Sequence, residues 1–147
     1  MMTIRTVLAA IAFFSFAPGA GFGQQTGLFY NIDAEAAIEG TVREVIRTPL
    51  YQDRQPFIQV VLEDDAQERT LVEVCPAWYA DIDFRVGDRL SVVGSLSGAE
   101  GAPKSMIARI VEFEDRTLVL RDKRGFPNWR GGTRAKQGRR RGRGFVP

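Results

Sequence analysis

The sequence predicts an all-β domain organised around one central segment, residues 86–96. In this segment a Gly87-Asp88 turn leads into alternating apolar and polar residues, which is typical of a half-buried antiparallel strand. Two β-rich segments (residues 38–75) precede it and one (residues 105–122) follows, whereas residues 76–84 show no alternation. Three strands, a short helical plug and two or more further strands are the order of an OB-fold, a small Greek-key barrel. An SH3-like barrel or a sandwich of the same strands is the alternative.

The N-terminal residues have the pattern of a secretory signal peptide. Arg5 provides the positive charge, residues 7–16 are an apolar run of ten, and small residues follow at Ala20, Gly21 and Gly23. A run of this length is too short to span a bilayer, which takes about 20 residues. We therefore expect cleavage after Gly23, export to the periplasm or beyond, and no transmembrane segment in the mature protein. Because no cysteine lies near the cleavage site, a lipid anchor is not expected.

The remaining 124 residues are enough for one small domain with a tail. Their charge is unevenly distributed. Residues 24–122 carry 10 Lys and Arg against 18 Asp and Glu, whereas residues 123–147 carry 9 basic residues and no acid. We expect a lead-in at residues 24–35, a barrel at residues 36–130 and a disordered, Arg- and Gly-rich tail at residues 131–147.

The strands are expected at residues 38–46, 57–63, 69–75, 86–96, 105–113 and 116–122. In the central strand Leu90, Val92 and Leu96 share the inward face, and Gly94 suggests a bulge or a close approach of another backbone. In the third strand Val72 and Val74 share one face, opposite Leu71, Glu73 and Cys75.

The segment between the third and fourth strands, residues 76–84, is expected to be the helical plug. It begins with Pro76, which suits the first turn of a helix. Its apolar residues Trp78, Ile82 and Phe84 would cover the open end of the barrel.

Five short segments of the chain resemble a family of small exported bacterial β-barrel proteins. They are IEGTV at residues 38–42, CPAWY at residues 75–79, VGD at residues 86–88, IAR at residues 107–109 and LRDKRGFPNW at residues 120–129. The spaced ending, LRD-x-x-G-x-P-x-W, is the most specific of them. The resemblance implies the barrel and the export, and it implies no catalytic residue. The Arg-rich extension after Trp129 departs from the family pattern.

The composition argues against an enzyme. The chain contains no histidine, which excludes Ser-His-Asp and Cys-His catalysis and the usual imidazole ligands of metals and haem. Asp64 and Asp65 stand where a hairpin turn favours Asp, and Asp81 and Asp83 lack the spacing of a calcium loop. We expect solvated turn residues here, with no metal and no cofactor.

Cys75 is the one residue with a reactive thiol. It could be a thiolate ligand of haem, or form a disulfide between chains in an oxidising compartment. It could equally be a small buried residue at a strand end, which we favour because no basic residue adjoins it to lower its pKa. Trp78, Tyr79 and Trp129 are likewise expected to pack rather than to stack on a ligand.

An OB-fold raises the question of oligonucleotide binding, which needs a basic groove with aromatic rings. The second and third strands and their turn instead carry many carboxylates, so nucleic acid is an unfavourable ligand. Suitable chemistry remains in two places, the loop at residues 48–56 and the tail. The candidate binding residues are Tyr51, Arg54, Arg139, Arg140, Arg141 and Arg143.

From these observations the sequence predicts an exported, non-enzymatic binding or accessory module of the cell envelope. Its expected partner is an envelope protein or an anionic surface. A redox accessory protein that uses the Cys75 thiol or a haem is the second hypothesis, and an oligonucleotide-binding domain is the third.

Overall fold

The computed structural model describes residues 29–50, 55–130 and 138–139. A short 3-10 helix, η1 (Ile32–Ala34), leads into seven strands: β1 (Glu35–Pro49), β2 (Pro56–Glu63), β3 (Arg69–Pro76), β4 (Arg89–Ser97), β5 (Lys104–Phe113), β6 (Arg116–Val119) and β7 (Gly138–Arg139). No helix among these residues is long and apolar enough to cross a membrane. The predicted signal peptide, residues 1–23, lies outside the described residues.

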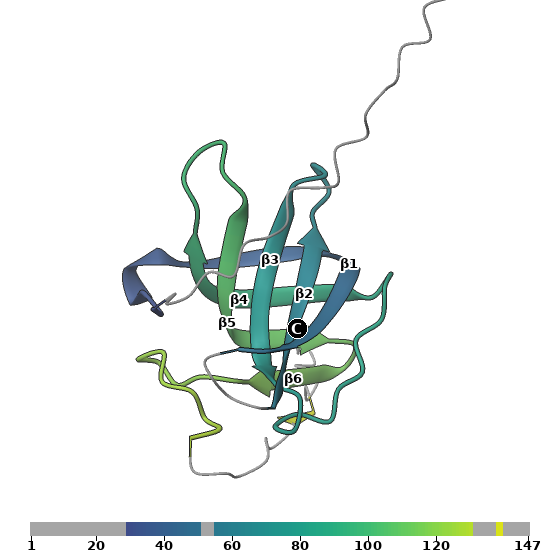
Figure 1. Cartoon of the computed structure of the whole chain (residues 1–147), viewed down its shortest axis with the longest axis vertical. Helices are drawn as coiled ribbons and strands as arrows, with labels where there is room; N and C mark the ends of the chain where they lie inside the picture. Colours follow the sequence, from purple (N-terminus) through teal and green to yellow (C-terminus); the bar gives the residue numbers. More distant parts are fainter. Residues whose placement is uncertain (1–28, 51–54, 131–137, 140–147) are drawn as a thin grey trace, which may run out of the picture.

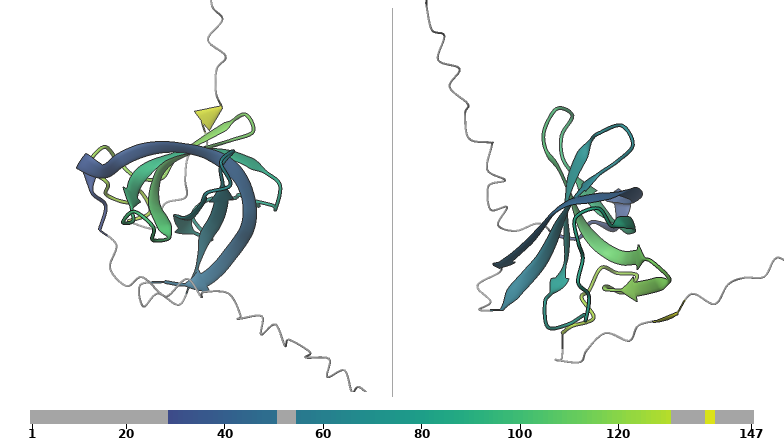
Figure 2. Two further views of the ribbon diagram at one scale, coloured as in Figure 1. Left: turned by 90° about the horizontal axis from the view of Figure 1, so that it is seen from above. Right: turned by 90° about the vertical axis from the view of Figure 1, so that its right-hand side faces the viewer.

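The strands form a closed barrel. Their order is β3-β2-β1-β4-β5-β6-β7, and a parallel pairing of β3 with β5 joins the two sides of the sheet. β1 is long enough to pair with β4 through its first half and with β2 through its second half, so it curves around the barrel (Figures 1 and 2). The prediction of an all-β, OB-fold-like barrel is confirmed.

The interior is filled by the apolar residues of alternating strand positions. Leu90 and Val92 of β4 are buried as predicted, and Leu96 packs at the edge of the same core. The largest fully buried side chains come from strands β1 to β6 and, for Leu120, from the residues just after β6: Val42, Ile58, Val60, Leu62, Val72, Val74, Leu90, Val92, Met106, Val111, Leu118 and Leu120. The barrel is therefore a packed core rather than a channel.

The sheet contains three register shifts, with Arg43 as the extra residue between β1 and β2, and one shift each between β4 and β5 and between β2 and β3. Opposite Gly94 the pairing of β4 with β5 shifts by one residue, and Arg109 is the extra residue. The predicted irregularity at Gly94 is thus confirmed, with the inserted residue on the partner strand. The shift between β2 and β3 makes Val74 the extra residue. Cys75 therefore lies in the core together with Val72 and Val74, and the prediction that it faces away from them is wrong.

The predicted helical plug at residues 76–84 is also wrong. Tyr79 N–H donates to the Pro76 carbonyl at 2.9 Å, which closes a turn, and residues 81–85 are then irregular. Ala80, Ile82 and Phe84 are buried while Asp81, Asp83 and Arg85 are exposed, so the segment alternates like an extended chain. Its packing against the core is retained without a helix.

The strand ends also differ from the prediction. β1 begins before and ends after the expected strand at residues 38–46, because each half of β1 has its own partner strand. The last long strand ends at Val119 rather than at residue 122, and Arg121 then forms an isolated bridge with Pro127. Gly138 and Arg139, expected to be disordered, form β7 on the edge of β6. The free backbone groups of an edge strand accept such a partner whatever its side chains.

Candidate functional site

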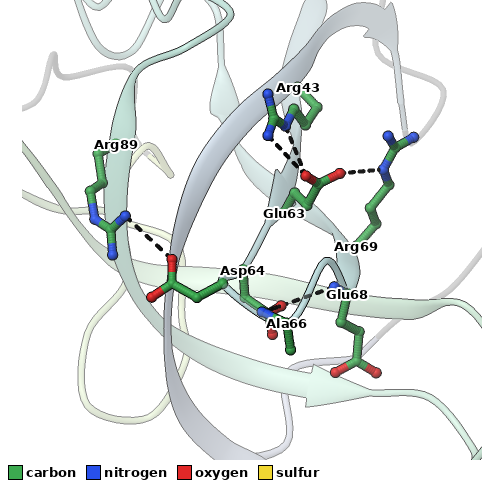
Figure 3. A network of polar contacts seen from close by, with 8 residues as sticks. Arg43, Glu63, Asp64, Ala66, Glu68, Arg69 and Arg89 are labelled. Carbon is green, nitrogen blue, oxygen red and sulfur yellow. Dashed lines mark hydrogen bonds and ion pairs between the residues drawn. The ribbon is translucent and has the colours of Figure 1, made fainter.

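The outer face of β2 and β3 is covered by ion pairs rather than by a basic groove. Glu63 accepts hydrogen bonds from Arg43 at 2.9 and 3.1 Å and from Arg69 at 2.9 Å (Figure 3). These arginines, Arg69 foremost, hold the pKa of Glu63 below its usual value. Glu73, expected on the same face, is instead buried. Because the cations here already have carboxylate partners, the face offers little to a phosphate backbone.

The turn between β2 and β3 contains two aspartates, Asp64 and Asp65, and each of them has polar partners. Asp64 Oδ1 accepts hydrogen bonds from the backbone N–H groups of Ala66 and Glu68, both at 2.9 Å (Figure 3). Asp65 pairs with Arg89 at 3.6 Å, and Arg89 also donates to Glu39 at 2.7 Å. Asp64 is thus a turn residue, as its sequence context predicts. No group of three or more Cys, Asp or Glu among the described residues could hold a metal ion.

A cavity of about 150 Å³ opens beside this turn. The Lys104 ammonium on its rim pairs with Glu68 at 2.7 Å. This volume is about half that of the smallest usual small-molecule sites, roughly 300 Å³. The cavity therefore does not argue for a metabolite or a nucleotide. Its lining is Ile38, Glu39, Leu62, Asp64, Glu68, Thr70, Leu96 and Lys104.

The opposite end of the barrel is closed by aromatic rings. The Trp129 ring makes edge contacts with Phe57 and Tyr79, with centroids 5.8 and 5.5 Å apart. The Arg121 guanidinium lies 4.8 Å from the Trp129 ring centre and 3.4 Å from the Glu73 carboxylate. The two most distinctive sequence segments, residues 75–79 and 120–129, therefore meet here. As predicted, Tyr79 and Trp129 pack against the barrel.

The pair Arg121 and Glu73 is a feature that sequence reasoning missed. Both side chains are almost completely buried, with 10% and 7% of their surfaces exposed. Arg121 also donates to the Gly125 carbonyl at 3.3 Å. A charged residue within an otherwise apolar strand, such as Glu73 between Val72 and Val74, is the signal that could have indicated a buried partner.

Cys75 is buried at the same end of the barrel. None of its surface is exposed, and burial raises the pKa of its thiol to about 12. The Ala80 backbone and the positive charge of Arg121 oppose this rise only in part. A thiol in this position is protonated at neutral pH and closed to a second chain or to haem. Its surroundings favour the packing role over the redox hypothesis.

This environment predicts that Cys75 reacts very slowly in the native protein. At pH 8 a thiol with this pKa is almost entirely protonated, and because none of its surface is exposed, reagents cannot reach it. We expect a disulfide reagent such as Ellman's reagent to label it at least 100-fold more slowly than in the urea-unfolded chain. Absorbance of the released thiolate measures the rate. Equal rates in the native and unfolded proteins would show that the thiol is accessible.

The other predicted site residues lie largely beyond the described parts of the chain. Tyr51 and Arg54 precede β2 in the sequence, and Arg140, Arg141 and Arg143 follow β7; all five lie outside the described residues. Arg139 is in β7, whose backbone pairs with Arg116 and Thr117 of β6. Of the six candidate binding residues, Arg139 is therefore the one within the described part of the chain, and its backbone lies beside β6.

Comparison with known proteins identifies the family of this barrel. Residues 35–118 match the MamS/MamX magnetosome protein family. The chain belongs to this family. The MamS/MamX match begins at the first residue of β1 and ends within β6, so it covers the five strands β1 to β5 that close the barrel. The ending at residues 120–129 lies beyond it. The family comparison thus supports the bacterial barrel family that the sequence resembles, without testing that motif.

No curated protein matches the chain. Among solved structures, the chain is similar to the dimeric N-terminal domain of the PriB protein from Thermoanaerobacter tencongensis, at 12% identity and a TM-score of 0.43. That match covers 56% of this chain and 97% of the PriB domain.

Proposed function

We propose that this protein is an exported, non-enzymatic accessory module that attaches to an anionic component of the cell envelope through its basic C-terminal segment. Membership in the MamS/MamX magnetosome protein family supports an accessory role. The signal-peptide pattern of residues 1–23 supports export. The observation that carries the proposal is the separation of charge between barrel and C-terminal segment.

This separation has a clear physical meaning. Within the described barrel, several carboxylates pair with arginines or with backbone N–H groups, as in the Glu63 and Asp64 clusters. From Lys123 to the end of the sequence there are nine basic residues and no acid to neutralise them. An uncompensated basic segment is suited to an anionic surface, where each basic residue contributes about 1 kcal/mol. The barrel provides the folded body, and the segment provides the attachment.

A deletion of residues 131–147 tests this division. We expect the melting temperature to fall by only a few degrees, because the deletion removes a single two-residue edge strand, β7. Binding to isolated envelope membranes, measured by co-sedimentation, should fall at least tenfold, because six of the nine basic residues are lost. Binding of the full chain should also weaken from low to physiological salt, where screening acts over about 8 Å.

A matched control keeps the length of the chain. Replacing Arg139, Arg140, Arg141 and Arg143 by Gln removes charge and leaves the backbone able to form β7. This variant should lose most of the binding while melting like the full chain. A loss of binding on deletion but not in the Gln variant would contradict an electrostatic attachment. Binding that is independent of salt would contradict it too.

A further inference from the structure

Two exposed aromatic side chains come from opposite ends of the described chain to one part of the surface. Phe29, in the lead-in, is 90% exposed and Phe126, after β6, is 55% exposed. The residues next to them are in contact, since the Tyr30 ring packs directly on Gly125. A Cβ at Gly125 would lie 2.2 Å from Tyr30 Cδ1. Exposed apolar surface that is contiguous and rimmed by polar residues marks protein or membrane interaction sites.

The turn that carries Phe126 is held rigidly. Asp122 Oδ1 accepts hydrogen bonds from the N–H groups of Arg124 at 2.8 Å and Phe126 at 3.0 Å. Asp122 and Gly125 close the same turn through backbone hydrogen bonds, and Gly125 has a φ of +84° that favours glycine. Lys123, Arg124 and Phe126 are thereby presented to solvent on a fixed backbone.

Hydrogen bonds and an ion pair also hold the lead-in against the barrel. The Tyr30 hydroxyl donates to Glu35 Oε2 at 2.8 Å, and Glu35 is paired with the guanidinium of Arg109, the bulged residue of β5. The hydrogen bond from Arg109 lowers the pKa of Glu35 below its usual value. This carboxylate therefore stays ionised and bonded to Arg109 and Tyr30. The Asn31 N–H donates to Ser95 Oγ at 3.0 Å. Phe29 therefore adjoins an anchored residue.

We propose that Phe29, Lys123, Arg124 and Phe126, the lead-in patch, dock on an anionic phospholipid bilayer. The proposal deepens the proposed function by naming the anionic component and a folded surface that contacts it. In this arrangement the phenylalanine rings enter the headgroup region, and the ammonium and guanidinium groups of Lys123 and Arg124 contact lipid phosphates. Aromatic and basic side chains side by side are the combination that binds such interfaces.

The charge of the described barrel favours a bilayer facing this patch. Residues 123–130 carry three basic side chains and no acid, and the Arg-rich tail continues from them. The turn between β2 and β3, with Asp64, Asp65 and Glu68, lies at the top of Figure 1, whereas the segment after β6 lies at the bottom. An anionic surface therefore attracts Lys123, Arg124 and the basic segment that follows them, and repels the turn between β2 and β3.

The test uses the full mature chain and vesicles of phosphatidylglycerol and phosphatidylcholine, with phosphatidylcholine vesicles as the neutral reference. We expect F29A/F126A to lower the partition into anionic vesicles about tenfold or more, because two apolar side chains no longer enter the interface. K123Q/R124Q should lower it roughly fivefold for each charge at low salt. Both variants should melt like the wild type, because all four side chains are exposed.

Val86→Ala is the matched control for the phenylalanine variant. Val86 is also an exposed apolar residue, but it lies outside the lead-in patch. It comes just before β4 begins, whereas the lead-in is hydrogen-bonded to Ser95 near the other end of β4. It should bind vesicles like the wild type. Equal binding by F29A/F126A and the wild type would overturn the lead-in patch, and so would equal binding to neutral and anionic vesicles.

A comparison with envelope membranes separates the two proposals. If the full chain binds isolated envelope membranes but not anionic vesicles, a protein or another anionic polymer is the partner; the patch proposal then fails and the proposed function stands. If the full chain binds neither, both proposals fail. If the deletion of residues 131–147 alone abolishes vesicle binding and F29A/F126A has no effect, attachment belongs to the tail only, and the patch proposal fails.

Discussion

We expect Val92→Asp to abolish folding of the barrel. Val92 has no exposed surface and lies at the centre of β4, opposite Ile38 of β1 and Val111 of β5. A carboxylate introduced there has no cation within the apolar core to pair with, and its burial costs several kcal/mol. This is comparable with the whole stability of a small domain, about 5–15 kcal/mol. Circular dichroism should show no cooperative thermal transition.

Val119→Asp is the matched control for this substitution. Val119 belongs to β6 and is 47% exposed, so the same new carboxylate remains in water. Its effect on the free energy of unfolding should stay within about 1 kcal/mol. If Val92→Asp instead melts cooperatively near the wild-type temperature, the inward face of β4 has been assigned wrongly.

The order and faces of the strands were predictable because they depend on local patterns. Alternation of period two marks each strand, and Leu90 and Val92 are buried as this pattern requires. The same pattern is present at residues 80–85, where buried Ala80, Ile82 and Phe84 alternate with exposed Asp81, Asp83 and Arg85. Pro76 suggested a helix there, and the alternation that indicates an extended chain was the better signal.

The position of Cys75 shows the limit of face assignment from alternation. A strict period of two puts Cys75 opposite Val72 and Val74. The bulge at Val74 shifts the register against β2 by one residue and turns Cys75 into the core. Such a shift depends on how two strands meet and leaves no mark in the pattern of one of them.

The candidate surfaces were less predictable because their residues are distant in sequence. Glu73 and Arg121 are 48 residues apart, and Glu35 and Arg109 are 74 residues apart. The contact of Tyr30 with Gly125 joins the two ends of the described barrel. Only closure of the sheet brings these pairs together, so composition and spacing indicate the types of charge but not their partners.

We expect Gly94→Val to be nearly as damaging as Val92→Asp, for a different reason. Where β5 bulges at Arg109, its backbone passes directly over Gly94. A Cβ at Gly94 would lie 2.2 Å from the Ile107 carbonyl oxygen and 3.0 Å from Ala108 Cα. Both are backbone atoms, so relief requires β5 to move away from β4, and β5 also closes the barrel against β3. Overpacking of this severity costs about 3–5 kcal/mol.

The substitutions at Gly94 and Gly101 distinguish a lack of space from backbone strain. Gly101 has a φ of +79° and nothing within 4 Å of its would-be Cβ, so Gly101→Ala introduces strain alone, costing about 1–2 kcal/mol. Gly94→Ala introduces the clash with Ile107. We therefore expect Gly94→Ala to lower the melting temperature by roughly twice as much as Gly101→Ala, or more, and Gly94→Val to lower it further, by about 15–30 °C in total. Equal melting of the two alanine variants would show that β5 does not approach β4 at Gly94.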